Sequence, residues 1–426
     1  MNVVISIAGS IGDVLPHVAV GWELKRRGHT VTLVANASFE RRAREAGLGF
    51  IAAGTEAEYE RFLADAEFWE PGLKHIERAR AEHYYPRLFD FYRAVLQNAA
   101  SARTVIIGGE AGGMMAAEKL GVPLAHIACA PAISIFTQSQ YDPSHPERLL
   151  PPWARWFAGD ARRLSILCRL NELRRRTGRA NGHPVQLPLE HPLARLRAEA
   201  GLSPLREFTP RPRLTLCMWP AWFAAPQRDW PAGAMVTDFP FYPRPKRAPS
   251  ARGALDHAAP IVVTTGSAAG SQFTFYTTAV EACSTVGRPV VLVSPHRNHI
   301  PATLPSNVTW VPHAPFDELF SRAALVVHHG GIGTASYGIA SGIPQIVMPM
   351  RGDQFDNGNR LQRLGVARML SARRTPAAKL RATVEFMLES TQVASRCRHW
   401  QSRIDVEAGT RTAADVIEAQ FDSNPK

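Results

Sequence analysis

A seven-residue stretch in the second half of the chain brings together residue types that bind anions. Residues 328–334 read HHGGIGT and follow the apolar run AALVV at 323–327. The run predicts a buried strand that ends at His329, and TASYGIASG at 334–342 predicts the helix that follows. Glycines between them would let backbone N–H groups at the helix N-terminus approach an anion, where the helix dipole also places partial positive charge. The expected ligand is a phosphate or a diphosphate.

Two other nucleotide-binding motifs share part of this pattern. A P-loop is excluded because no G-K-[ST] follows the glycines. A dinucleotide fold keeps some support, since Gly331 and Gly333 match part of G-x-G-x-x-G and Asp353 lies twenty residues beyond Gly333. Ser336 stands where the third glycine would be, and Asn36 ends the second predicted strand where an acid would be wanted. A dehydrogenase is therefore a secondary interpretation, which quenching of NAD(P)H fluorescence would test.

Four further segments indicate which elements position this stretch. Each places a glycine after a helical stretch and before an apolar run, and they lie at 26–35, 119–128, 285–294 and 340–349. Glycine at a helix C-terminus allows a left-handed turn, and the apolar run then predicts a buried strand. Alternation of helices with fully buried strands is typical of a parallel sheet. Because the pattern occurs twice before residue 130 and twice after residue 260, the sequence predicts an α/β protein with two Rossmann-like lobes.

Composition places the boundary between these lobes. Residues 239–253 are rich in proline and basic residues and lack periodicity, which favours an extended connection. APIVVTTGS, which follows, restarts the pattern with a strand. We therefore expect an N-terminal lobe at 1–238, a linker at 239–258, a C-terminal lobe at 259–405 and a C-terminal helix at 406–426 that could return to the N-terminal lobe.

The overall composition excludes several classes of protein. The chain has 426 residues, of which 45% are hydrophobic and 20% charged, as in an ordinary globular protein. Its five cysteines are scattered without metal-ligand spacing, so a reducing cytoplasm fits best. The N-terminus reads as a first strand and not as a signal peptide, and no apolar run is long enough to span a membrane. A formal net charge of +12 favours an anionic partner, but nucleic acid is not expected because no recognition motif appears.

Longer motifs resemble one family. The segments at 310–312 (WVP), 328–334 (HHGGIGT), 341–349 (SGIPQIVMP) and 352–357 (GDQFDN) resemble the donor-binding signature of the UDP-glycosyltransferase superfamily. The opening GSIGDVLP at 9–16 is similar to that of its bacterial and sterol-type members. The resemblance implies a GT-B type fold, in which two Rossmann-like parallel-sheet lobes face each other across a cleft. The nucleotide-sugar would bind the C-terminal lobe and the acceptor mainly the N-terminal one.

The same resemblance implies a set of donor-binding residues. Tyr337 departs from the plant pattern, which places a glutamate there for the ribose. No D-x-D stands at a strand end, so we expect no metal to bridge the diphosphate. The residues that the pattern assigns are Gly266, Ser267, His329, Gly331, Gly333 and Thr334 for the diphosphate, Trp310 for the base, and Asp353 and Gln354 for the sugar hydroxyls.

Transfer of a sugar to a hydroxyl group needs a base that takes the hydroxyl proton. Asp13 follows the first predicted strand, at the carboxyl edge of the sheet, where ligands of such folds bind. In the family, plant members carry a histidine at this place, and bacterial and sterol-type members carry an aspartate. Asp13 could instead cap the helix that follows, which is a common use of aspartate. Glu110, at the end of TVIIGGE, is a second candidate that would support Asp13 in catalysis.

Two segments narrow the resemblance. PAWFAAPQRDWP at 220–231 and TDFPFY at 237–242 are most similar to the rhamnosyltransferase family of bacterial rhamnolipid synthesis. This implies an inverting, metal-independent enzyme that moves L-rhamnose from dTDP-L-rhamnose to a hydroxyl of a lipid such as a 3-(3-hydroxyalkanoyloxy)alkanoate, with no cofactor besides the nucleotide-sugar. Trp222 and Phe223 would line the acceptor site. The basic amphipathic segment at 151–179 is either a docked surface helix or a contact with the acceptor lipid or the inner membrane.

Alternatives stay open at this point. One is a UDP-glucose-dependent glucosyltransferase that acts on a sterol, a macrolide or an aromatic acceptor. Another is a nucleotide-binding partner subunit without catalysis, although the retained Asp13 argues against it. The sequence also leaves open whether an acyl-transferring partner subunit is required. A matrix of donors against acceptors would distinguish these hypotheses.

Overall fold

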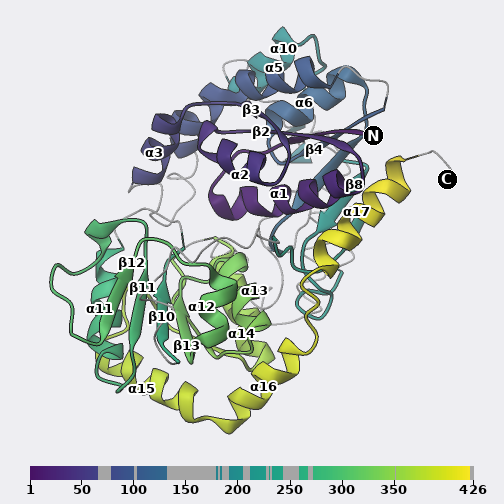
Figure 1. Cartoon of the computed structure of the whole chain (residues 1–426). Helices are drawn as coiled ribbons and strands as arrows, with labels where there is room; N and C mark the ends of the chain where they lie inside the picture. Colours follow the sequence, from purple (N-terminus) through teal and green to yellow (C-terminus); the bar gives the residue numbers. More distant parts are fainter. Residues whose placement is uncertain are drawn as a thin grey trace. The chain divides into compact units, whose positions relative to one another are not determined.

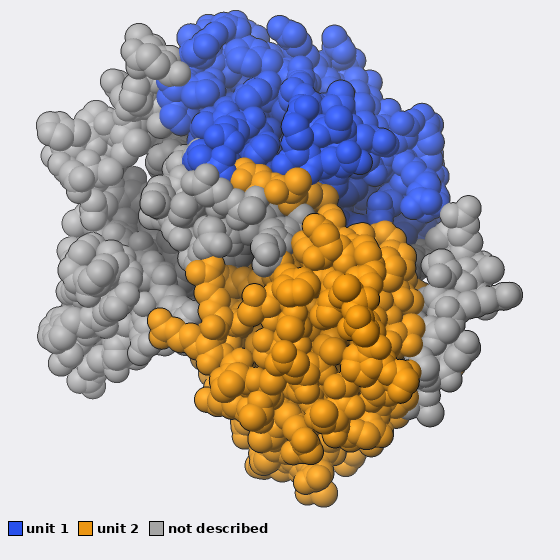
Figure 2. Space-filling view, turned by 90° about the vertical axis from the view of Figure 1, so that its left-hand side faces the viewer, with its two compact units in different colours: residues 1–62, 73–243, 407–426 blue, residues 63–72, 244–406 orange. Residues whose placement is uncertain are grey.

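The chain divides into two units by its internal contacts. Unit 1 comprises residues 1–62, 73–243 and 407–426, and unit 2 comprises residues 63–72 and 244–406 (Figure 2). The computed structural model describes residues 1–65, 78–99, 103–131, 191–204, 212–226, 230, 233–242, 259–266, 272–350 and 352–422, together with the backbone of a short antiparallel ladder between β6 (Arg179–Ala180) and β7 (His183–Pro184).

Unit 1 is built on a seven-stranded parallel sheet. Its central strands are almost entirely buried, as expected for a sheet that is covered on both faces. In register, Asn2 of the central strand lies opposite both Thr30 and Thr104. The strands, in spatial order, are β3 (Gly49–Ala52), β2 (Thr30–Ala35), β1 (Asn2–Ser6), β4 (Thr104–Gly108), β5 (Leu124–Ala128), β8 (Leu214–Cys217) and β9 (Ala234–Val236).

Two apolar cores form in unit 1. One joins the sheet to α1 and α17, and the other joins it to α5, α6 and α10. The helices are α1 (Ile11–Arg26), η1 (Ala37–Phe39), α2 (Glu40–Glu45), α3 (Glu56–Ala64), the π-helical turn η2 (Arg80–Tyr84), η3 (Tyr85–Arg87), α5 (Leu88–Asn98), α6 (Ala111–Leu120), α10 (Pro192–Glu199) and α17 (Ala408–Phe421).

The C-terminal helix α17 belongs to unit 1, although the chain passes through unit 2 before it. It lies beside α1 (Figure 1, yellow beside purple). Arg27, at the end of α1, binds Asp415 at 2.6 Å and Glu418 at 2.8 Å. Behind these ion pairs, Ala413, Ala414 and Ile417 are fully buried in the core. Apolar contact and charge pairing together hold the last helix on the first.

Unit 2 is built on a six-stranded parallel sheet. Its strands, in spatial order, are β12 (Val308–Val311), β11 (Val290–Val293), β10 (Ile261–Thr264), β13 (Leu325–His328), β14 (Gln345–Val347) and β15 (Ala367–Met369). Its helices are α11 (Phe273–Cys283), η6 (Arg297–His299), α12 (Phe316–Arg322), α13 (Ile332–Ala340), α14 (Gln354–Leu364), α15 (Ala377–Glu389) and α16 (Thr391–Gln401).

Both sheets have the Rossmann strand order, so the predicted α/β class with two Rossmann-like lobes is confirmed. When the strands of each large sheet are numbered in chain order, the first six run 3-2-1-4-5-6 in space. The winding direction reverses between β1 and β4 in unit 1, and between β10 and β13 in unit 2. Ligands of open parallel sheets bind beyond the carboxyl ends of the strands at such a switch point.

Two findings concern a possible contact with a membrane. Within the described part of the chain, no helix is long and apolar enough to cross a bilayer. The basic segment predicted as a helix at 151–179 lies outside the described residues, apart from the backbone of Arg179.

Candidate functional site

The loop after β13 turns sharply at Gly330 and delivers the chain to α13. Gly330 has a φ of +95°, and a Cβ there would lie 2.8 Å from the carbonyl oxygen of Gln354, so only glycine fits. Gly331 is the N-cap of α13, and no side chain of the described residues caps this helix end. The first N–H groups of α13, through Gly333 and Thr334, are therefore available to an anion at the switch point.

His329 lies against two glycines at the start of this helix. A Cβ on Gly266 would lie 2.9 Å from His329 Cε1, and a Cβ on Gly331 would lie 2.5 Å from its Nε2. The imidazole therefore occupies space that both glycines leave open. Its Nδ1 is buried without a hydrogen-bond partner among the described residues, and burial lowers the pKa of His329 to about 4. The ring is neutral at pH 7 and has one N–H to donate.

The loop after β10 is held by Tyr276 of α11. The Tyr276 hydroxyl accepts a hydrogen bond from the Thr265 backbone N–H at 3.1 Å and donates to the Val293 carbonyl at 2.8 Å. The Gly266 N–H donates to Thr264 Oγ1 at 3.0 Å, which fixes the glycine beside His329. Sequence reasoning missed Tyr276, because no motif marks a buried tyrosine that acts through a neighbouring loop. Ser267, predicted to close over the diphosphate, lies outside the described residues.

The start of α14 lies against the same loop. Asp353 is half-buried, and its Oδ2 accepts a hydrogen bond from Asn357 Nδ2 at 2.9 Å. Asn357 Nδ2 also donates to the Gly330 carbonyl at 2.9 Å, so Asp353 is connected to the turn before α13. Gln354 is buried, and its Oε1 accepts from the Met350 N–H at 2.9 Å. Of the predicted sugar-binding pair, Asp353 is thus the more accessible, and the Gln354 amide oxygen is used within the loop.

Trp310 and Tyr337 are placed by packing. Trp310 lies near the carboxyl end of the edge strand β12, where its indole N–H donates to the Ser294 carbonyl at 3.0 Å. The Arg297 guanidinium lies 5.5 Å from the centre of the Trp310 ring system. Tyr337 packs edge-on against Phe316, with ring centroids 6.3 Å apart. Its aromatic ring therefore contributes to the contact between α12 and α13.

In unit 1, Asp13 lies in the first turn of α1 at the switch point. Its Oδ2 accepts hydrogen bonds from the Ser10 backbone N–H at 2.8 Å and from Ser10 Oγ at 2.9 Å. A Cβ on Gly9 would lie 2.5 Å from this oxygen, so glycine is needed to admit the carboxylate. Ser10 is the N-cap of α1, and Asp13 is the N3 residue of the capping box. Asp13 thus takes part in capping without being the N-cap itself, and it remains half-buried at the carboxyl edge.

Glu110 caps the N-terminus of α6 with its own side chain. It is the N-cap residue and only 4% exposed. Its Oε2 accepts from the Gly112 N–H at 2.6 Å, and its Oε1 accepts from Ser6 Oγ at 2.6 Å and from the Gly113 N–H. Burial raises the pKa of Glu110 to about 7, against the opposing effect of these hydrogen bonds. Both carboxylate oxygens are thus engaged within unit 1.

Two buried histidines lie beneath the same edge, and sequence reasoning did not identify them. His17 Nδ1 donates to the Asp13 carbonyl at 2.8 Å, and His126 Nδ1 donates to the Gly108 carbonyl at 2.9 Å. Burial lowers the pKa of each to about 4. Both rings are therefore neutral at pH 7, and they belong to the interior of unit 1.

The predicted acceptor residues follow β8. Phe223 is 4% exposed and packs against Phe239, with ring centroids 5.2 Å apart. Trp222 is half-buried and lies 5.9 Å from the same Phe239 ring. Phe223 therefore supports an aromatic cluster, and Trp222 is the member of the pair with accessible surface.

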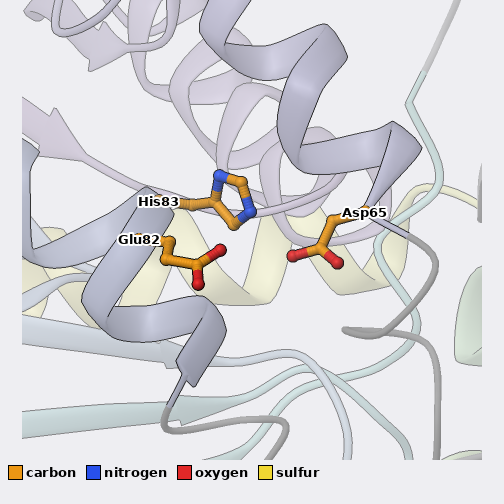
Figure 3. A group of neighbouring side chains, drawn as sticks. All are labelled: Asp65, Glu82 and His83. Carbon is orange, nitrogen blue, oxygen red and sulfur yellow. The ribbon is translucent and has the colours of Figure 1, made fainter.

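Among the described residues, one group of potential metal ligands is formed by the residue after α3 and two residues of η2. Single ligand atoms of Asp65, Glu82 and His83 lie within 4.8 Å of one another (Figure 3). Glu82 is exposed and already pairs with the guanidinium of Arg78. We therefore assign this group no function.

Comparison with known proteins covers both units. Residues 3–125 match the family model "Glycosyltransferase family 28 N-terminal domain", and residues 279–407 match "Erythromycin biosynthesis protein CIII-like, C-terminal domain". The chain is 28% identical to O-mycaminosyltylonolide 6-deoxyallosyltransferase of Streptomyces fradiae, over 98% of this chain and 97% of that one. It is 37% identical to oleandomycin glycosyltransferase of Streptomyces antibioticus, in an alignment that covers only 38% of each protein.

The fold is also that of solved glycosyltransferase structures. The solved structure of spinosyn rhamnosyltransferase SpnG, complexed with thymidine diphosphate, matches with a TM-score of 0.63 and 19% identity, over 99% of this chain and 100% of that one. The first family model thus matches residues of unit 1, the second matches residues of unit 2 up to its end, and the alignment with the 6-deoxyallosyltransferase spans both units. The chain therefore has the GT-B fold of solved glycosyltransferases, and its sequence is similar to a glycosyltransferase along nearly its whole length.

Proposed function

We propose that this chain transfers a sugar from a nucleoside diphosphate to a hydroxyl group of an apolar acceptor. The observation that carries the proposal is the beginning of α13, where uncapped N–H groups and the neutral ring of His329 lie together at the carboxyl end of β13. Backbone N–H groups at a helix N-terminus suit a diphosphate because they combine hydrogen-bond donors with partial positive charge.

The donor would extend from this point towards β12. As the bond between sugar and diphosphate breaks, negative charge grows on a phosphate oxygen, and the α13 N–H groups and the His329 N–H would stabilise it. Asp353 would accept hydrogen bonds from the sugar hydroxyls. Trp310 lies three strands from β13, about 14 Å at the usual strand spacing. That separation leaves room for a nucleoside between a base contact at Trp310 and the diphosphate.

Asp13 is the proposed base. The acceptor hydroxyl would give its proton to the carboxylate while its oxygen bonds to the anomeric carbon, and the diphosphate would leave with the electron pair of the broken bond. Attack opposite the leaving group would invert the anomeric centre. The two hydrogen bonds from Ser10 would fix the orientation of the carboxylate. The contacts of Glu110 favour a capping role for that residue over support of the base.

The identity of the sugar and of the acceptor is proposed from fewer observations. L-Rhamnose from dTDP-L-rhamnose agrees with the name of the spinosyn enzyme, and a lipid acceptor with the two segments that resemble the rhamnolipid family. A macrolide acceptor is the second candidate, favoured by the near full-length similarity to a tylonolide glycosyltransferase. Contacts with an inner membrane or an acyl-transferring partner would depend on residues 151–179, which lie outside the described part of the chain.

A matrix of donors and acceptors tests the proposal. Purified full-length chain is incubated with dTDP-L-rhamnose or UDP-glucose and with a 3-(3-hydroxyalkanoyloxy)alkanoate, a macrolide or a sterol, and the products are identified by mass. We expect glycosylation of at least one apolar acceptor, its loss in Asp13→Asn, and unchanged activity with EDTA. Absence of binding to both dTDP and UDP by calorimetry would overturn the proposal. Loss with EDTA and recovery with Mg²⁺ would overturn the metal-independent mechanism.

A further inference from the structure

Two buried side chains hold the peptide groups of Gly330 from both sides. The Gly330 N–H donates to His328 Nδ1 at 3.1 Å, and the Gly330 carbonyl accepts from Asn357 Nδ2 at 2.9 Å. His328 and Asn357 are both fully buried. Because Gly330 makes the turn that leads into α13, these two bonds set the angle at which the loop presents His329 and Gly331.

The bond to Gly330 also defines the tautomer of His328. Since Nδ1 accepts a hydrogen bond, the proton of the neutral ring lies on Nε2, which donates to Gln345 Oε1 at 2.9 Å. Gln345 Nε2 in turn donates to the Ala335 carbonyl of α13 at 3.4 Å. One side of the turn is thus connected to the helix itself, through uncharged groups.

Asn357 makes the connection on the other side. Its amide nitrogen carries two hydrogens, and the two acceptors it contacts are the Gly330 carbonyl and Asp353 Oδ2, each at 2.9 Å. The first belongs to the loop of the proposed diphosphate site, and the second to the carboxylate proposed to bind the sugar. A single buried side chain therefore spans the two parts of the donor site.

We infer that Asn357 is a positioning residue that couples the sugar-binding carboxylate to the diphosphate loop. The inference rests on the proposed function, because the two groups matter together only if one donor molecule contacts both. A sugar nucleotide is reactive when its anomeric carbon and its leaving diphosphate are held in one alignment, and a displacement of about 1 Å can lower the rate by about 10²-fold. Asn357 would act through Asp353 and Gly330 and would not itself touch the donor.

Asn307 provides a matched control in the same unit. Its Nδ2 also bridges two carbonyl oxygens, those of Ser284 at 2.8 Å and Arg288 at 3.2 Å. It precedes β12 and so lies at the amino edge of the sheet, opposite to the donor site. Asn307→Leu removes the same kind of bridge as Asn357→Leu, so it reports the cost of a bridge that only supports the fold.

The experiment compares the affinity for dTDP with the affinity for dTDP-L-rhamnose, and measures kcat, in the full-length chain. Both Leu variants should be less stable to denaturant than the wild type. Of the two variants, we expect only Asn357→Leu to lower kcat, by about 10- to 100-fold. It should also reduce the affinity for the sugar nucleotide about tenfold more than the affinity for dTDP. Asn357→Ser, which keeps one donor in a smaller side chain, should give a smaller loss of the same kind and serves if the Leu variant does not fold.

The outcomes separate the inference from the proposed function. The coupling role is wrong if the folded Asn357 variants have the same kcat as Asn307→Leu. It is also wrong if these variants lose equal affinity for dTDP and for the sugar nucleotide. In both cases the glycosyltransferase proposal stands. If the wild-type chain itself binds no nucleoside diphosphate, the proposed function fails before the variants are compared.

Discussion

At the switch point of unit 1, two helices begin against carboxylates of their own chain. Asp13 accepts hydrogen bonds from Ser10 at the start of α1, and Glu110 accepts them from the Gly112 and Gly113 N–H groups at the start of α6. At the switch point of unit 2, Gly331 is the N-cap of α13, and no side chain of a described residue caps this helix.

The two units share one strand order, but this difference in capping fits them for different ligands. A helix N-terminus attracts negative charge, and a carboxylate of the chain that occupies it leaves less attraction for an anionic ligand. Unit 2 leaves that position open and places a neutral histidine beside it, which suits a diphosphate. Unit 1 fills it and keeps Asp13 at the edge, which suits a neutral hydroxyl that must lose a proton. The following predictions test the comparison.

The largest expected effect is a loss of folding stability in acid, because both units contain buried neutral histidines. Burial lowers the pKa of His17 and His126 in unit 1 to about 4, and that of His328 in unit 2 to about 3, from 6.5. At these rings the unfolded chain binds more protons than the folded chain below pH 6.5, so their contribution to stability is full above pH 6.5 and is lost as the pH falls towards 4. Each pKa unit corresponds to about 1.4 kcal/mol.

Urea denaturation between pH 7.5 and 4 measures this loss. His126→Asn should reduce the slope, because an asparagine amide can still donate to the Gly108 carbonyl but does not titrate. A transition midpoint that stays constant down to pH 4 would contradict the assignment of neutral buried rings. Added dTDP should protect unit 2 and not unit 1.

His329→Ala should produce the largest loss of activity. Without the ring, the α13 N–H groups alone would stabilise the leaving diphosphate, and kcat should fall about 10²- to 10³-fold, as is usual when one donor to a developing oxyanion is removed. Steady-state rates with the active donor measure the effect, and circular dichroism should show an unchanged fold. Activity within a few-fold of wild type would remove His329 from the site.

Thr334→Asp would make unit 2 resemble unit 1. Thr334 is the third residue of α13, the position that Asp13 has in α1. A carboxylate there would compete for the first N–H groups and repel a diphosphate, so we expect dTDP to bind about 10- to 100-fold more weakly, about 1.4 to 2.7 kcal/mol. Thr334→Asn is the control in the same calorimetric measurement, because asparagine has the shape of aspartate without its charge. Equal affinity in both variants would mean that the diphosphate binds elsewhere.

Glu110→Gln should have the smallest effect, and on stability alone. A glutamine amide would bring its NH₂ group against an N–H of Gly112 or Gly113, or against Ser6, so the α6 cap should weaken by about 1 kcal/mol. Urea denaturation measures this cost, while turnover should stay within a few-fold of wild type. A loss of kcat beyond tenfold would restore Glu110 as a residue that supports the base.

The alternation of helices and buried strands could be read from local pattern, because a helix, its glycine C-terminus and the next strand are each specified by neighbouring residues. Near the donor site the prediction was close. The strand expected to end at His329 is β13, which ends at His328, and the helix expected from 334 is α13, which begins at Ile332. Two glycines of HHGGIGT have a steric reason: Gly330 has a positive φ, and a Cβ on Gly331 would collide with His329. Such requirements leave a visible trace in the sequence.

What each polar group does was decided only by tertiary structure. Sequence placed Asp13 as either base or cap, and the bonds from Ser10 show that it has the contacts of a cap. It proposed Gln354 for the sugar, whereas the fold directs the Gln354 amide oxygen to the Met350 N–H. It did not single out Asn357, which reaches Gly330 across 27 residues of chain. The physical reason is that a hydrogen bond depends on which partner the fold brings within about 3 Å, and no local pattern records that distance.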